Sequence, residues 1–144
     1  MFEYISPKRL PYSAQLYTIR EVLENQFQVF LADRKFPDRC CIETTRLVST
    51  VLGLEQVAGE YTPHRTTHAW NYDPDRGLFI DLTQDQFPSP FWNRIPKIAV
   101  LPIDTRRLKL TRANVVRQHA IRLPEVTRFV RSLNADVLAR LRIQ

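Results

Sequence analysis

Two neighbouring strand-like segments constrain the fold of this chain more than any other feature. Residues 67–72 and 77–82 are rich in residue types that favour strands, and residues 73–76 between them are Asp-Pro-Asp-Arg, a sequence typical of a turn. If those four residues form a hairpin loop, opposed positions sum to 149 and His68 lies opposite Asp81. The pattern therefore predicts a β-hairpin that holds an imidazole beside a carboxylate, whereas a slip of one residue would place them on opposite faces.

Three longer segments have the apolar periodicity of amphipathic helices. Helices are expected over residues 12–31, 40–52 and 124–141, and further strands over residues 56–61, 98–103 and 108–111. The second helix should end at Gly53, which suits the left-handed conformation, and the third could break near Asn134. With 44% hydrophobic and 25% charged residues, the chain can bury a core of its own. We predict a single α+β domain over residues 1–144, with helices packed on an antiparallel sheet.

Two adjacent cysteines, Cys40 and Cys41, stand at the start of the second predicted helix. The helix dipole and the unpaired N–H groups there favour a thiolate. A thiolate is also stabilised by a nearby imidazolium, and an imidazole is commonly oriented by a carboxylate. The order of these groups along the chain predicts a catalytic triad of one cysteine with His68 and Asp81. Helical periodicity places both cysteines on partly apolar faces and does not choose between them.

A zinc site is the chemical alternative to this triad, with Cys40, Cys41, His64 and His68 as ligands. Adjacent cysteines lack the spacing that is usual in zinc chelation, and they are poorly placed to form a disulfide with each other. We therefore expect neither a metal nor a cofactor. Trp70, two residues after His68, is expected to shape a substrate pocket, to shield the charged pair, or to be an ordinary core residue.

The charge is divided unevenly along the chain. Residues 1–91 hold 9 basic and 12 acidic residues, a net charge of −3, whereas residues 92–144 hold 12 and 3, a net charge of +9. The basic half is either a solvated surface or a docking face for an acidic partner. Its basic residues include Arg106, Arg107, Lys109, Arg112, Arg117 and Arg122. A non-catalytic binding module that docks an acidic protein or nucleic acid is therefore the alternative function, although few aromatic residues lie here to stack on bases.

The sequence also bears on location. No run of eighteen apolar residues is present, so we expect no membrane span. The first ten residues lack a cationic start followed by an apolar stretch, so we expect no secretory signal. A cytoplasmic site of synthesis follows, and export without a cleaved signal remains open.

Around these positions the chain resembles the transglutaminase-like branch of the papain-like cysteine superfamily. The resemblance is carried by Cys-Ile-Glu-Thr-Thr-Arg-Leu at 41–47, His-Ala-Trp at 68–70, Ile-Asp-Leu-Thr at 80–83 and Gln-Phe at 86–87. In these motifs the chain is similar to small bacterial transglutaminase-like proteins. The resemblance covers about residues 38–88. The resemblance implies a papain-like (transglutaminase-like) core, Cys41 rather than Cys40 as nucleophile, and a deamidase, peptidase or amidase that acts on a protein or peptide.

The expected chemistry is acyl transfer through a thioester. His68 takes the proton of Cys41, the thiolate attacks an amide carbonyl, and Asp81 orients the imidazole. Backbone N–H groups at the helix start stabilise the oxyanion. A side-chain oxyanion donor could be Gln26 or Gln28, and the sequence does not choose between them.

Overall fold

The computed structural model describes residues 3–30, 35–88, 94–110 and 123–143. Its helices are α1 (Ser13–Phe30), α2 (Cys41–Leu52) and α4 (Leu123–Ile143). Its strands are β1 (Glu55–Tyr61), β2 (Thr66–Asp73), β3 (Leu78–Asp81), β4 (Ala99–Pro102) and β5 (Leu108–Leu110). Short 3-10 turns lie at η1 (Pro7–Arg9), η2 (Thr62–His64) and η3 (Gln84–Gln86). Among these described residues, no helix is both long and apolar enough to cross a bilayer.

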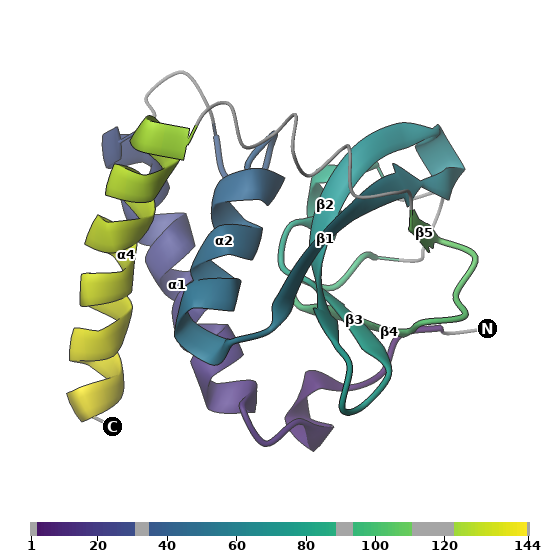
Figure 1. The fold of residues 1–144 in the computed structure, drawn as a ribbon, viewed down its shortest axis with the longest axis horizontal. Coiled ribbons are helices and arrows are strands. Elements are labelled where there is room, and N and C mark those ends of the chain that lie inside the picture. Colours follow the sequence, from purple (N-terminus) through teal and green to yellow (C-terminus); the bar gives the residue numbers. More distant parts are fainter. Residues whose placement is uncertain (1–2, 31–34, 89–93, 111–122, 144) are drawn as a thin grey trace.

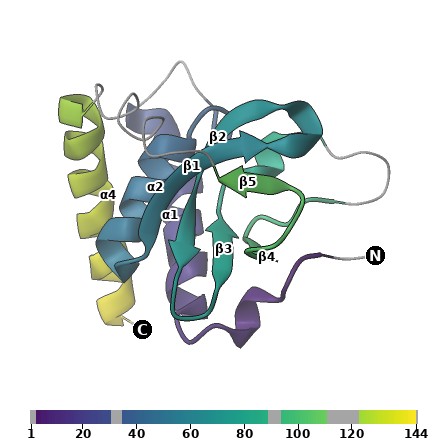
Figure 2. The ribbon, with the colours of Figure 1, turned by 45° about the vertical axis from the view of Figure 1, so that its right-hand side comes forward.

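The five strands form one antiparallel sheet in the order β4-β3-β2-β1-β5. The sheet curls, and the three helices stand together on one side of it (Figure 1). The N-terminal segment runs beside β4, where the Ile5 N–H donates to the Val100 carbonyl over 2.7 Å (Figure 2). The predicted α+β class, with helices packed on an antiparallel sheet, is confirmed.

The two sides of the sheet bury different kinds of side chain. On the helix side the core is aliphatic, with Leu16, Ile19 and Leu23 of α1, Leu47 and Val48 of α2, Val130, Leu133 and Val137 of α4, and Ile80 and Val100 of the sheet. On the other side the core is built from Tyr61, Trp70, Phe79, Ile95, Leu101 and Leu108. Successive strand residues point to opposite faces, so one strand supplies both cores. We call these the aliphatic side and the aromatic side.

The predicted hairpin is right in its strands and wrong in its register. The pairs Asn71–Ile80, Tyr72–Phe79 and Asp73–Leu78 sum to 151 rather than 149. Asp73 belongs to the strand because its side chain caps the loop: Oδ1 accepts the N–H groups of Asp75 and Arg76 over 3.1 and 3.2 Å. A shift of two residues preserves the face of every side chain, so His68 and Asp81 still point to the same side.

The helix predictions fall within two residues of the observed ends. Gly53 follows α2 with φ +72°, and its N–H donates to the Ser49 carbonyl, as expected for a C-terminal cap. The break near Asn134 is wrong: α4 continues, because Leu133 and Val137 are both buried in the aliphatic core. Leu138 of the same helix is 40% exposed.

Candidate active site

Three elements bring the predicted triad together. Cys41 is the first residue of α2, His68 lies near the start of β2, and Asp81 ends β3. His68 Nε2 lies 2.6 Å from Asp81 Oδ2, and both side chains are only 1% exposed. Cys41 lies near enough to the imidazole to raise its pKa. Because Asp81 occupies Nε2, the nitrogen that remains for the thiol is Nδ1.

The charges around His68 favour its protonated form. Burial lowers the pKa of the imidazole, but the Asp81 carboxylate opposes this by its charge and its hydrogen bond, and Cys41 adds to it. The net effect raises the pKa of His68 from 6.5 to about 10. At neutral pH the buried ring is therefore an imidazolium held between a carboxylate and a sulfur atom.

The two cysteines occupy different environments. Cys40 is fully buried, and its thiol donates to the Asp38 carbonyl over 3.0 Å. Cys41 is half-buried and contacts His68. The structure thus brings the thiol of Cys41 to the imidazole, and the other thiol points to the preceding turn.

Asp81 is held by four hydrogen-bond donors. Oδ1 accepts the backbone N–H of Thr83 over 2.9 Å and its hydroxyl over 3.2 Å. Oδ2 accepts the amide of Gln84 over 3.3 Å in addition to His68. A buried carboxylate remains ionised only when donors replace its lost water, and these four donors meet that need.

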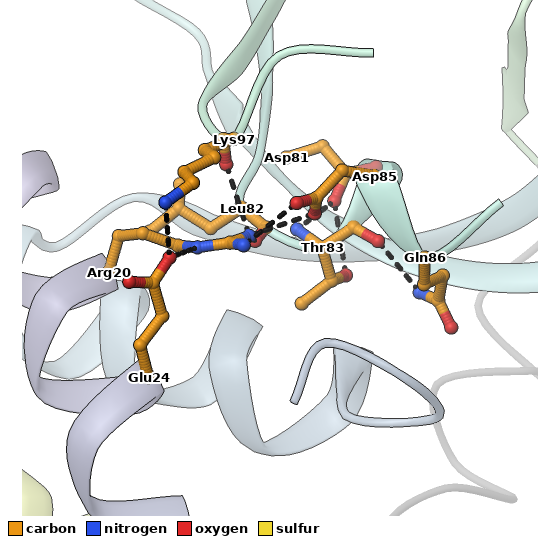
Figure 3. A network of polar contacts seen from close by, with 8 residues as sticks. All are labelled: Arg20, Glu24, Asp81, Leu82, Thr83, Asp85, Gln86 and Lys97. Atoms are coloured by element: carbon orange, nitrogen blue, oxygen red, sulfur yellow. Dashed lines mark hydrogen bonds and ion pairs between the residues drawn. The ribbon is translucent and has the colours of Figure 1, made fainter. Parts of the chain in front are cut away.

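Arg20 of α1 fixes the loop that follows Asp81 (Figure 3). Its two terminal nitrogens donate to the Asp85 carboxylate over 2.8 and 2.7 Å, and one of them also donates to the Leu82 carbonyl over 2.6 Å. The side chain is 7% exposed, and its Nε pairs with Glu24. We did not predict this role. The signal was present, since Arg20 lies within the apolar stripe of the first helix, between Leu16 and Leu23.

Gln86 connects the loop that follows Asp81 to the turn before Cys41. Its Oε1 accepts the backbone N–H of Arg39 over 3.1 Å, and its Nε2 donates to the Thr83 carbonyl over 2.9 Å (Figure 3 shows the second of these bonds). Arg39 has φ +55°, a left-handed conformation that is costly for a side chain with a Cβ. The two hydrogen bonds of Gln86 therefore stabilise a strained backbone in the turn that leads into α2.

Aromatic rings surround the imidazole. Phe87 meets His68 edge-on at 4.9 Å between centroids, and Trp70 stacks at 6.0 Å. Trp70, expected to shape a substrate pocket, to shield the charged pair or to be an ordinary core residue, is fully buried. Gly59 makes room for it: a Cβ there would lie 2.6 Å from Trp70 Cη2 and 2.1 Å from the Lys109 carbonyl oxygen. The rings exclude water from the charged pair.

Among the described residues, the four ligands of the alternative zinc site do not form one metal-binding group. The exposed ring of His64 packs on Tyr61, and its Nε2 lies 3.3 Å from the Pro88 carbonyl. Across the part of the chain that the structure describes, no three His, Cys, Asp or Glu side chains are grouped as metal ligands. Gln26 makes no described contact with the triad, and the side chain of Gln28 lies outside the described residues.

Comparisons of the chain with protein-family models, with curated proteins and with solved structures give no match.

Proposed function

We propose that this protein is a cysteine-dependent enzyme that acts on amide bonds, built on a papain-like (transglutaminase-like) core. One observation carries the proposal: a buried His68–Asp81 pair, 2.6 Å apart, lies beside a cysteine at a helix N-terminus. The order of thiol, imidazole and carboxylate, with each group oriented by the next, is the arrangement that activates a nucleophile.

The proposed reaction begins with the proton of Cys41 already on His68. The thiolate attacks the amide carbonyl, and the negative charge that develops on oxygen is stabilised by N–H groups at the start of α2. His68 then gives its proton to the leaving ammonia or amine, and the C–N bond breaks to leave a thioester. A water molecule, which gives a proton to His68, attacks the thioester. The tetrahedral intermediate that forms then collapses, which releases the carboxylic acid and returns the thiolate.

The surroundings of the triad support these steps. Asp81 keeps the imidazole in one orientation and favours the charged form that protonates the leaving group. Trp70 and Phe87 exclude water on two sides of the ring, which strengthens the attraction between the charges. Cys41 is half-buried, so a substrate can reach it. A carboxamide side chain or a peptide bond fits this chemistry, which makes a protein or peptide the proposed substrate.

Labelling of the two cysteines tests the proposal. Iodoacetamide at about pH 6, well below the usual thiol pKa of about 8.5, should alkylate Cys41 and spare Cys40, as read by peptide mass mapping. A glutamine-containing peptide library should yield ammonia or new termini with the wild-type protein. Cys41→Ala should abolish both signals, and the matched variant Cys40→Ala should retain most of each. Equal labelling of the two cysteines would contradict the proposal.

A docking surface for an acidic partner is the second candidate function, and one observation favours it. An open hollow of about 400 Å³ lies beside β5, bordered by the exposed side chains of Arg106 and Lys109 and by exposed Ile103 and Leu110. Asp104 also lines it. Arg107 also belongs to the basic half, but it forms an ion pair with another segment: its Nε lies 3.0 Å from the carboxylate of Glu3.

A further inference from the structure

A chain of hydrogen bonds connects Asp81 to two distant parts of the sequence. Gln84, which is fully buried, donates from Nε2 to Asp81 Oδ2 over 3.3 Å. Its Oε1 accepts the hydroxyl of Tyr4 over 2.6 Å. Arg107 donates to the same hydroxyl oxygen over 3.3 Å, and its guanidinium lies 5.2 Å from the centre of the Tyr4 ring. Tyr4 precedes the segment that pairs with β4, and Arg107 immediately precedes β5.

The direction of this chain is fixed at its far end. Arg107 can only donate, so the Tyr4 oxygen accepts from it and the Tyr4 hydrogen is free to be given to Gln84. Gln84 Oε1 must then face Tyr4, which turns its amide N–H groups toward Asp81. Asp81 can only accept from such a neighbour. It therefore stays an acceptor toward His68 as well, which places a proton on Nε2 and leaves Nδ1 toward Cys41.

We propose that Tyr4 is a positioning residue for this site: through Gln84, its hydroxyl holds Asp81 as an ionised acceptor and so sets the tautomer and charge of His68. The catalytic consequence, a ready thiolate at Cys41, rests on the proposed function. The effect on His68 does not, because it concerns the hydrogen bonds of the folded protein alone.

Among the residues that the structure describes, few other groups can set the charge of His68. Asp81 of β3 and Cys41 of α2 act on it by charge and hydrogen bond. Tyr61 of β1 meets the ring edge-on at 6.4 Å, and Phe87 and Trp70, the remaining rings beside it, are neutral. His64 packs on Tyr61 and Phe87, one ring further out. A change at Tyr4 therefore reaches His68 through Gln84 and Asp81.

Tyr4→Phe isolates the hydroxyl, because it keeps the ring beneath Arg107. Without that hydroxyl, Gln84 is free to rotate, and Asp81 loses one of the donors that hold its charge. A buried carboxylate with fewer donors is less able to stay ionised, and it is the ionised form that keeps His68 protonated against burial. NMR titration should show the His68 pKa about one unit lower than in wild type, a tenfold fall in proton affinity.

Three further variants make the test specific. Tyr17→Phe, on an exposed ring of α1, should leave the His68 titration unchanged. Gln84→Met should lower the pKa in the same direction, and adding Tyr4→Phe to it should add nothing, because Tyr4 acts through Gln84. A Tyr4→Phe protein that melts earlier but titrates like wild type at His68 would overturn the inference, since a purely structural tyrosine behaves in that way.

The pH dependence of Cys41 alkylation separates this inference from the proposed function. If both hold, Tyr4→Phe moves the rise in alkylation rate to higher pH along with the fall in the His68 pKa. If wild-type Cys41 shows no reactivity below the usual thiol range, the proposed chemistry fails, and the NMR titration still decides the role of Tyr4. If alkylation is fast at low pH and His68 does not respond to Tyr4→Phe, only the inference fails.

Discussion

The two sides of the sheet are built from the same strands but bury different kinds of side chain. On the aliphatic side, Ile80 and Val100 pack against helices, and burial of apolar surface provides stability. On the aromatic side, the neighbouring residues carry rings together with His68 and Asp81, whose polar atoms find partners inside the core. The difference shows that alternation along β2 and β3 separates stability from chemistry, and that a change of one residue in register would mix them.

The largest expected effect comes from removing the charge on the aromatic side. Asp81→Asn should lower turnover about 10²–10⁴-fold, because an amide no longer favours the imidazolium and can present an N–H to the ring. Leu133→Ala on the aliphatic side should cost about 2–5 kcal/mol of unfolding free energy and leave the His68 titration as it is. Steady-state rates and urea melts on both variants measure the contrast. A catalytic loss in Leu133→Ala at full occupancy of the folded state would contradict the separation.

The aromatic side should also make stability depend on pH. Folding raises the pKa of His68 from 6.5 to about 10. In Cys41→Ala, which has no thiol to supply that proton, the folded state therefore binds a proton that the unfolded state releases between those values. The resulting stabilisation is fully present below pH 6.5 and is lost as the pH rises toward 10, by as much as about 5 kcal/mol.

Denaturant melts across that range measure the effect. His68→Asn should remove this part of the pH dependence, whereas His64→Asn, on an exposed ring, should keep it. A stability of Cys41→Ala that stays flat from pH 6.5 to 10 would show that the histidine gains no proton on folding.

Arg20 connects the two sides. It lies on α1, a helix of the aliphatic side, and its side chain hydrogen-bonds with the loop after Asp81. Arg20→Gln should cost about 3 kcal/mol of unfolding free energy, since the partly buried Asp85 loses its bidentate partner. The His68 pKa should change little, because the four donors of Asp81 remain. Thermal melts and the His68 titration measure the two effects, with Arg46→Gln on α2 as the control. Loss of the raised His68 pKa would show that the loop, and not Asp81 alone, determines it.

Much of this arrangement could be predicted from the sequence, because it depends on periodicity. The helices and strands follow from apolar spacing, and the shared face of His68 and Asp81 survives the error in register because 149 and 151 are both odd. The error came from Asp73, whose side chain replaces backbone partners in the loop. No pattern of apolar residues records such a bond.

The supporting residues of the site could not be predicted in the same way. The supporting hydrogen bonds join residues that lie 62 to 103 positions apart in the sequence. They are made by Tyr4, Arg20 and Gln84. Spacing along the chain carries no record of those partners. Arg20 alone left a trace, as a charge inside an apolar stripe. The preference for Cys41 over Cys40 came from the family resemblance, because helical periodicity left both cysteines open.

The smallest expected effect concerns the hollow at the margin of the aromatic side, which Phe79 and Leu108 also line. The double change Arg106→Gln with Lys109→Gln should alter unfolding free energy by no more than about 0.5 kcal/mol, since both side chains are exposed. If the hollow binds an acidic segment, the affinity for a polyglutamate peptide should fall in this variant. In the wild type it should weaken as salt rises through about 0.05–0.5 M.

The exposed arginines Arg128 and Arg131 of α4 provide the matched control, because changing both to Gln removes the same charge from the other side of the molecule. Turnover of a small neutral amide should be the same in all three proteins, since the hollow contains none of the triad. Binding that falls equally in both variants would mean that net charge alone attracts the peptide. A loss of small-amide turnover confined to Arg106→Gln with Lys109→Gln would instead place this margin within the active site, and the separation between recognition and chemistry on the aromatic side would be wrong.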